Sequence, residues 1–380
     1  MAPERLRVAG DKLLLPNNAP ALLRGFNLEF MLDSVNSAPR AMTDNMMMQR
    51  FPRANLVRLV MVHWHDRPTE LWGNRNRSND CSETETPGQT VSHRCLEMFD
   101  SVLNWTAAHG LWAIVTARAS IAAGEAVAGH EYGTVFTNMT LQRSFIDMWR
   151  TLAERFRTVD RIAGYEPLSE PRVEPDASGV ADDAVRNFYM RACIAIATVD
   201  PRTPCMVGAT RFYNKHRLDT ILLRPLSNVI YLFNAFVENT MNWTSGSPAI
   251  PYGGLSACCS LHSRFDSSAC CQQACCDRAV RFDHSFLNSE LQKALAFSRS
   301  HRVPVLCDQW GAPRGAGPSR LTFARDLIGL FAIFNLSWAF WEWRQRSYSP
   351  FAVLHFDHGW KKPWVDEEML EVLTVPLGGV

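Results

Sequence analysis

The 380-residue sequence has no excess of charge of either sign. Its 39 Lys and Arg residues are balanced by 38 Asp and Glu residues, which leaves a formal net charge of +1. Neither sign is gathered into a long block, so the electrostatic attraction that holds polyanions is missing. The composition therefore excludes nucleic acid and anionic membrane surfaces as predicted partners.

The sequence also lacks a hydrophobic run long enough to cross a bilayer. Its most apolar stretch, Leu327–Trp341, is shorter than the ~20 residues that a membrane helix needs, and it contains Asn335 and Ser337. Residues 1–5 lack the apolar core of a signal peptide. The remaining composition, 47% hydrophobic and 20% charged, is typical of a globular protein with a large core.

Three short motifs that would indicate other chemistries are missing. No Gly-rich phosphate loop follows the first predicted strand, which disfavours an open dinucleotide-binding sheet. No Gly-x-Ser-x-Gly occurs, so the nucleophile elbow of serine hydrolases is absent. The Cys-rich segment contains no Cys-x-x-Cys spacing, which disfavours a zinc site there.

Cysteine, in contrast, is abundant, with eleven residues. Six form adjacent pairs within one short segment, where we predict disulfides: Cys258, Cys259, Cys270, Cys271, Cys275 and Cys276. Cys81 and Cys95 flank a polar segment and form a second candidate bridge. Cys307 lies in an apolar run, so we predict that it is buried and free.

Five glycosylation sequons accompany these cysteines, at Asn76, Asn104, Asn138, Asn242 and Asn335. Sequons arise by chance, and we expect Asn335 to be buried. Together with the cysteines they favour an oxidising, secretory compartment. We therefore expect that a secretory signal has been removed ahead of Met1.

Short apolar runs alternate with longer amphipathic segments almost from end to end, which is typical of a parallel sheet with crossover helices. Eight strands are predicted, at Leu22–Phe30, Asn55–Trp64, Leu111–Ala119, Ile162–Glu170, Cys205–Arg211, Asn228–Phe236, Val303–Trp310 and Ser337–Trp343. Helices are predicted between most of them, including Thr90–His109, Leu141–Arg157, Ala181–Thr198, Ser285–His301 and Arg320–Phe334. This pattern predicts an α/β fold, a (β/α)₈ TIM barrel, whose chemistry lies at the C-terminal ends of the strands.

We predict one catalytic domain over residues 1–380. Residues 5–21 form an N-terminal hairpin, residues 237–284 a Cys-rich excursion, and residues 346–380 a C-terminal capping segment. Two connections are long, residues 65–88 after the second strand and residues 237–284 after the sixth. Loops of this length are usually functional or disordered, and both lie on the expected catalytic face.

At the end of the predicted fourth strand stands Glu170, followed by proline. Five segments share an order with one family: Leu23-Arg24-Gly25-Phe26-Asn27, Val57-Arg58-Leu59, Ser169-Glu170-Pro171-Arg172, Pro304-Val305-Leu306-Cys307-Asp308-Gln309-Trp310-Gly311 and Trp341-Glu342-Trp343. In these segments the sequence resembles family 5 glycoside hydrolases, which are retaining cellulase- and mannanase-like barrels. The resemblance implies that Glu170 is the acid/base and that Gln309 stands in the nucleophile's place. Double displacement needs those two groups about 5–5.5 Å apart.

Gln309 is where the sequence departs from the family, which has glutamate there. A neutral amide is a poor nucleophile and stabilises an oxocarbenium ion poorly, so catalysis should largely stop. An engineered Glu-to-Gln change and a natural loss of catalysis both remain open. Asp308 could substitute, but alternation along a strand predicts that it points to the opposite face.

The resemblance also yields a set of substrate-binding candidates: Arg58, Arg118, Ser169, Asn234, Trp310 and Trp341. Arg58 resembles the arginine that hydrogen-bonds the nucleophile, or it is a buried arginine paired with another carboxylate. Trp341 resembles the tryptophan on which the sugar stacks, or it is a core residue. Ser169, Arg118 and Asn234 replace other polar residues of the family.

A metal-dependent hydrolase is the alternative enzyme class, because His63 and His65 lie on one face of a strand end with Asp66 adjacent. No further histidines end the fifth and sixth strands to complete a ligand set, so we expect no metal and no cofactor. Two functions remain. The first is a retaining hydrolase of a β-linked glucan, mannan or related glycan, inactivated at Gln309. The second is a natural carbohydrate-binding pseudoenzyme. The sequence does not determine the oligomeric state.

Overall fold

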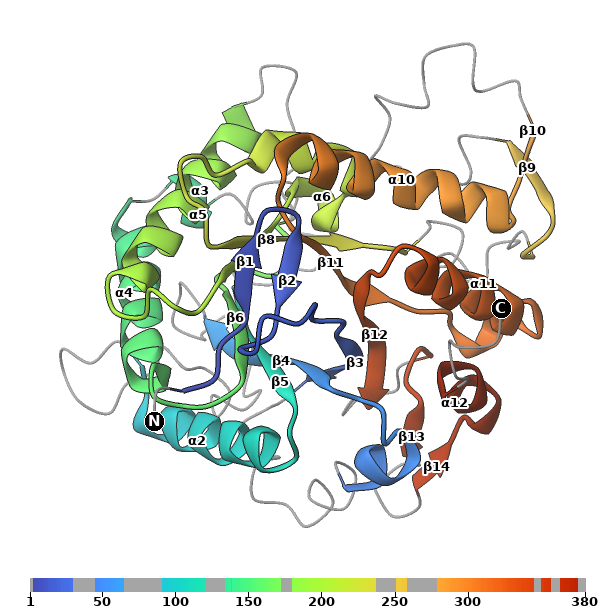
Figure 1. The fold of residues 1–380 in the computed structure, drawn as a ribbon, viewed down its shortest axis with the longest axis horizontal. Coiled ribbons are helices and arrows are strands. Elements are labelled where there is room, and N and C mark those ends of the chain that lie inside the picture. Colours follow the sequence, from blue (N-terminus) through green and yellow to red (C-terminus); the bar gives the residue numbers. More distant parts are fainter. Residues whose placement is uncertain are drawn as a thin grey trace, which may run out of the picture.

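The computed structural model describes residues 3–29, 45–64, 91–119, 134–137, 139–171, 180–236, 251–257, 279–344, 350–356 and 363–374. Its centre is a barrel of eight parallel strands: β3 (Arg24–Glu29), β4 (Leu56–Trp64), β5 (Trp112–Ala119), β6 (Ile162–Glu166), β7 (Cys205–Gly208), β8 (Val229–Asn234), β11 (Val305–Trp310) and β12 (Ser337–Arg344). Each strand pairs with the next, and pairing of β11 with β12 closes the ring (Figure 1). The predicted TIM barrel is therefore confirmed.

All eight predicted strands exist, and their ends differ from prediction by a few residues. The difference that matters most is in the fourth barrel strand, β6, which ends at Glu166 rather than at the predicted Glu170. Glu170 lies in the following loop with a φ of 48°. This left-handed backbone conformation is uncommon outside glycine and cannot continue a strand.

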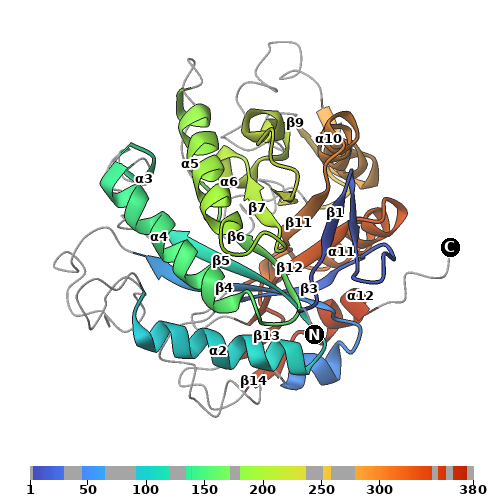
Figure 2. The same cartoon turned by 60° about the vertical axis from the view of Figure 1, so that its left-hand side comes forward.

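Helices surround the barrel and cover the outer faces of the strands (Figures 1 and 2). They are α2 (His93–Ala108), α3 (Thr134–Thr137), α4 (Met139–Phe156), α5 (Val180–Ala197), α6 (Thr210–Tyr213), α10 (His284–His301), α11 (Ser319–Ile333) and α12 (Glu367–Thr374), with 3₁₀ turns η4 (Lys215–Ile221) and η5 (Arg314–Ala316). The five predicted helices are confirmed. Among the described helices, none has the length and apolar character of a membrane span.

Alternation along the strands creates two apolar layers. On β4, Leu56 points into the barrel, whereas Val57 and Leu59 pack outward against the helices. The outer layer is the main core, and the inner layer is a smaller cluster that includes Trp112 and Ile114 of β5. Above this inner cluster the side chains inside the barrel are polar, and the candidate site lies in this polar region.

The predicted N-terminal hairpin is present as β1 (Arg7–Ala9) and β2 (Lys12–Leu14). Leu6 and Leu13 belong to the inner cluster, and both are buried. Arg5 bridges to the first residue of β6, which fixes the hairpin at the N-terminal ends of the strands. The hairpin therefore closes the floor of the barrel (Figure 1).

The C-terminal part extends the sheet beyond β12. Strand β13 (Leu354–Phe356) pairs with β12 and with β14 (Pro363–Val365). A buried ion pair between Arg320 and Asp366, with nitrogen–oxygen distances of 2.7 and 2.9 Å, joins this segment to α11. Within the predicted Cys-rich excursion, β9 (Leu255–Ala257) and β10 (Ala279–Arg281) form an antiparallel pair.

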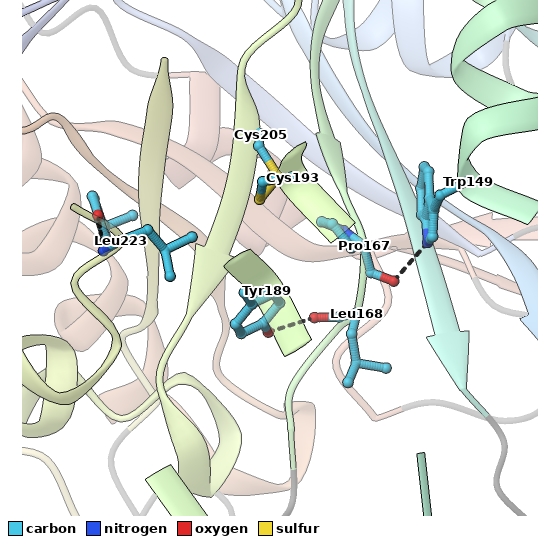
Figure 3. The surroundings of a disulfide bond; sticks show 8 residues. Trp149, Pro167, Leu168, Tyr189, Cys193, Cys205 and Leu223 are labelled. Atoms are coloured by element: carbon cyan, nitrogen blue, oxygen red, sulfur yellow. Dashed lines mark hydrogen bonds between the residues drawn. A yellow bond between two sulfur atoms is a disulfide. The ribbon is translucent and has the colours of Figure 1, made fainter. Parts of the chain in front are cut away.

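The cysteine predictions have mixed outcomes. Cys307 is buried and free, as predicted. Cys95 is disulfide-bonded, but its candidate partner Cys81 and the six paired cysteines lie outside the described residues. A disulfide that the sequence analysis missed joins Cys193 of α5 to Cys205 of β7, with a Cα–Cα distance of 5.6 Å (Figure 3).

The prediction that Asn335 is buried was wrong. It follows the end of α11 in a turn with a φ of 50°, and its side chain is exposed. The apolar residues around it suggested burial, but a turn between a helix and a strand faces solvent.

Candidate active site

The segment that follows β6 is held by hydrogen bonds from three aromatic side chains. Trp149 Nε1 donates to the Pro167 carbonyl over 2.9 Å. The Tyr189 and Tyr213 hydroxyls lie 2.9 and 2.6 Å from the Leu168 carbonyl (Figure 3 shows the Tyr189 bond). Because all three rings are fully buried, the backbone leading to the acid/base candidate is fixed.

Tyr213 reaches this position through an unusual backbone. Arg211, Phe212 and Tyr213 have consecutive φ values of 56°, 59° and 58°, which is the left-handed region that non-glycine residues rarely adopt. The Tyr213 ring lies over Gly208, where a Cβ atom would stand 2.1 Å from it. Only glycine at position 208 leaves room for the ring inside the barrel.

Glu170 itself is half-buried at the mouth of the barrel. Its Oε1 accepts a hydrogen bond from Asn234 Nδ2 over 2.7 Å. Asn234 ends β8, and its register partner on the adjacent strand is Gln309 of β11. One asparagine therefore stands beside both residues that the resemblance assigns to catalysis.

Arg58 of β4 forms the centre of a buried polar cluster. Its Nε and Nη2 bind the two carboxylate oxygens of Glu166 over 2.7 and 2.6 Å. Its other contacts are Asn27 Oδ1 and Ser169 Oγ, both at 2.8 Å. Burial would lower the pKa of Arg58, but the carboxylates of Glu166 and Asp308 outweigh it and raise the pKa.

Asp308 lies inside the barrel, whereas alternation counted from Gln309 predicted that it points to the opposite face. Its Oδ2 is 3.3 Å from Arg58 Nε, and its side chain is fully buried. Leu306 belongs to the inner cluster and Cys307 to the outer core, so ordinary alternation along β11 turns Asp308 inward, and the register shift after Cys307 affects the pairing of Gln309 and Trp310 instead. Burial raises the pKa of Asp308 well above its usual range, Arg58 opposes this, and Glu166 and Glu170 add to it.

Gln309 sits within the same register shift and is 2% exposed. Its backbone carbonyl accepts from Ala235 N over 2.9 Å, whereas its side-chain Nε2 is buried without a hydrogen-bond partner among the described residues. Within the same part of the chain, no hydrogen bond joins Arg58 to Gln309. Of the two interpretations of Arg58, the buried arginine paired with other carboxylates is the one observed.

The two tryptophan candidates have different surroundings. Trp310 is fully buried on the outer face of the barrel wall, with ring centroids 5.5 Å from Trp338 and 5.6 Å from Phe331. Packing against α11 explains this side chain, so its assignment to substrate binding was wrong. Trp341 is half-buried on β12 and precedes a cis peptide bond to Glu342.

The remaining candidates lie partly outside the described residues. Arg118 belongs to β5 and His63 to β4, but the structure does not describe their side chains. His65 and Asp66 lie outside the described residues altogether. Among the residues that the structure describes, no group of metal-ligating side chains occurs. The sequence analysis missed Glu166 and the two hydroxyls that donate to it, from Thr116 of β5 and Tyr213 of α6, although inward-facing polar residues on barrel strands were a usable signal for Thr116 and Glu166.

A barrel whose polar side chains gather above its inner core, with a glutamate beyond the fourth strand, has the architecture of glycosidases of this fold. The family described as Cellulase (glycosyl hydrolase family 5) matches residues 16–347. The chain belongs to this family. Endoglucanase C of Acetivibrio thermocellus and endoglucanase C307 of Clostridium sp. are each 20% identical to it over 294 residues, which cover 73% of this chain and 79% of each relative.

Solved structures agree on the fold. Endoglucanase Cel5A from Thermotoga maritima superposes with a TM-score of 0.64 at 17% identity, covering 93% of this chain and 97% of that chain. The cellulose synthase subunit Z of Clostridioides difficile gives a TM-score of 0.62 at 14% identity, covering 93% and 99%. The Thermotoga enzyme has been crystallised with cellobiose and with mannotriose.

Proposed function

We propose that this protein binds a β-linked glucan at the mouth of the barrel and derives from a retaining endoglucanase. The observation that carries the proposal is the position of Glu170 beyond β6, bonded to Asn234 at the end of β8. Family membership supports the reaction class, and the endoglucanase relatives support a glucan. Mannan is the second substrate to assay, because the Thermotoga structures include mannotriose.

In this proposal Glu170 protonates the leaving glycosidic oxygen. Asn234, which donates a hydrogen bond to this carboxyl, keeps it oriented toward the mouth. The first step of the double displacement, in which the leaving oxygen is protonated while the nucleophile attacks, fails in this chain. The Gln309 amide has no negative charge, so it neither attacks the anomeric carbon nor stabilises the oxocarbenium ion. We expect slow or no turnover with strong retention of binding.

Chemical rescue tests this assignment. In the Gln309→Gly variant, azide can enter the space left by the amide and attack an aryl β-cellobioside with an activated leaving group. The product should be the α-glycosyl azide, because attack from the side of β11 inverts the anomeric carbon. A rate that does not depend on azide, or a β-configured azide product, would contradict the placement of position 309 on the face opposite the leaving group.

The same background tests Glu170. With an activated leaving group that needs no proton, Gln309→Gly/Glu170→Gln should keep most of the azide-rescued rate. With a poor leaving group, the rescued rate should fall by about 10²–10⁴-fold, which is the usual contribution of general acid catalysis. Equal loss with both substrates would show that Glu170 is not the acid.

A carbohydrate-binding pseudoenzyme is the second candidate function. It is favoured by Arg58, whose charge is already matched by Glu166 and Asp308 without any carboxylate at position 309. Calorimetric titration of the unaltered chain with cellotetraose decides whether a binding function exists. Trp341→Ala should weaken that binding about tenfold or more if the ring is a sugar platform.

We further propose a secretory location. The Cys193–Cys205 disulfide and the disulfide-bonded Cys95 support it, because such bonds persist in oxidising compartments. Mapping of oxidised cysteines in protein recovered from culture medium, compared with cytosolic expression, tests this location.

A further inference from the structure

Position 308 raises a question that the proposed function does not answer. Alternation along β11, from Leu306 inside to Cys307 outside, turns Asp308 into the barrel, beside the arginine that the family is expected to pair with its nucleophile. Position 309, in contrast, carries no charge and does not bond to that arginine. The carboxyl next to Arg58 on β11 thus stands one residue before the position at which the resemblance to the family expects it.

The local charges show why this matters. Arg58 brings one positive charge into a region with no exposure, and Glu166 already binds it through two hydrogen bonds. Asp308 adds a second buried carboxyl, and neither of its oxygens accepts a hydrogen bond from the described residues. No other described cation lies within ion-pair distance of Glu166 or Asp308. A further carboxylate at position 309 would therefore enter a buried site without a positive partner.

We propose that Asp308 is a positioning residue that has taken over from position 309 as the second carboxyl partner of Arg58, so that positions 308 and 309 act as one unit. This proposal deepens the proposed function and rests on it for the catalytic readout. It implies that Gln309→Glu alone cannot rebuild a working nucleophile. The new glutamate would compete with Asp308 for Arg58 and would be driven toward its neutral form by a like charge.

The surroundings of the Asp308 carboxyl raise its pKa, in agreement with this proposal. Burial raises the pKa of its carboxyl, and the negative charges of Glu166 and Glu170 add to that effect, while Arg58 opposes it. A glutamate at position 309 would add one more negative charge to this set. Replacing the Asp308 carboxyl by an amide would free Arg58 for the new glutamate without changing the size of the side chain.

A four-member variant cycle tests the coupling. The unaltered chain, Asp308→Asn, Gln309→Glu and Asp308→Asn/Gln309→Glu are assayed on an aryl β-cellobioside across pH 4–9, and thermal midpoints are measured at the same pH values. We expect the double variant to exceed Gln309→Glu in kcat by at least about tenfold, the size of coupling usual for contacting residues. Asp308→Asn alone should stay inactive.

The pH profile separates positioning from mere stability. In Gln309→Glu, the limb that reports nucleophile ionisation should lie at higher pH than in the double variant, because two like charges share one arginine. Asp326→Asn combined with Gln309→Glu is the matched control. Asp326 accepts a hydrogen bond from Tyr252 on the outer layer, so this change should leave the pH profile unmoved.

The outcomes separate the two proposals. If Gln309→Glu is as active as the double variant and shares its pH profile, the coupling is refuted. If no variant hydrolyses any glucan, the proposed function fails, but the thermal data still decide the coupling. Gln309→Glu should then lower the midpoint more in the otherwise unaltered chain than in the Asp308→Asn variant. Equal losses in both backgrounds would overturn the inference.

Discussion

Two sides of the barrel mouth differ in how completely their polar groups are satisfied. On the β6 side, the carbonyls of Pro167 and Leu168 have aromatic donors, and Glu170 has an amide donor. On the β11 side, both Asp308 oxygens and the Gln309 Nε2 are buried without hydrogen bonds to the described part of the chain. Buried polar groups without partners are costly, so they need a reason. The difference teaches that these groups on the β6 side are held by hydrogen bonds, while those on the β11 side are not; under the proposed function these are the sides of the acid/base and of the nucleophile position.

Arg58 contacts both sides, so removing it gives the largest expected effect. Arg58→Met should lower the free energy of unfolding by about 3–5 kcal/mol, because Glu166 and Asp308 would remain buried without a cation. Denaturant titration followed by circular dichroism measures it. Arg50→Met, which removes an exposed arginine paired with Glu367, should cost less than about 1 kcal/mol. Similar losses in both variants would mean that the cluster is not an energetic centre.

Removal of the disulfide next to the β6 side should have the second-largest effect on stability. Cys193 lies one helical turn after Tyr189 on α5, so the bond holds that tyrosine against the Leu168 carbonyl (Figure 3). The double replacement Cys193→Ala/Cys205→Ala should cost about 3 kcal/mol, as expected for closing a loop of this length. Denaturant titration of both proteins without a reducing agent measures this cost, because a reducing agent would also break the bond of Cys95. An unchanged midpoint in the double variant would contradict it.

Tyr189 and Tyr213, both on the β6 side, should differ in how much each contributes to stability. The single hydroxyl proton of Tyr213 is shared between the Glu166 carboxyl and the Leu168 carbonyl, so Tyr213→Phe should cost about 1.5–3 kcal/mol. Tyr189→Phe removes a donor only from a carbonyl that keeps another, so about 1 kcal/mol or less is expected. Paired urea titrations give the order. The reverse order would show that the Glu166 contact contributes little.

The smallest effect is the pH dependence that Asp308 imposes on stability. Its pKa is raised in the folded protein, so the folded state holds the proton more tightly. Stability from this group is complete below the unfolded value of about 3.9 and is lost as pH rises toward the folded pKa. Asp308→Asn should flatten the fall in unfolding free energy as the pH rises above the unfolded value, and denaturant titrations over a series of pH values measure this slope.

Asp147→Asn is the matched control for this measurement. The Asp147 carboxylate is 52% exposed and pairs with Arg150 on the surface of α4. Its removal should leave the slope of stability against pH unchanged. A slope that stays the same in Asp308→Asn would show that Asp308 is not the group responsible.

The sequence was enough to predict the barrel, because eight apolar runs separated by amphipathic segments admit few other closed sheets. It was also enough to predict Cys307 and the position of Glu170 at the mouth. These features depend on composition and order along the chain. They do not require knowledge of which side chains meet.

The features that could not be predicted depend on strand register and on which side chains meet in the fold. Asp308 was predicted to lie opposite the site because alternation was counted from Gln309, whereas the register shift in β11 falls between Cys307 and Gln309 and has no signature in the residue types themselves. The Cys193–Cys205 bond was overlooked because the adjacent cysteine pairs dominate the pattern, although both residues stand in apolar positions. Tyr213 was missed because three left-handed residues carry its ring inward, and none of them is glycine.

The hairpin under the barrel has a practical meaning for anyone who trims this protein. The family match begins at residue 16, yet Leu6 and Leu13 fill the interior of the strands from below. Arg5 reaches across to Asp200 and to the carbonyls of Phe156 and Val159. An expression boundary drawn where the family begins would remove these side chains, open the lower end of the barrel to water, and leave a buried aspartate without its cation. The folding unit is larger than the homologous unit.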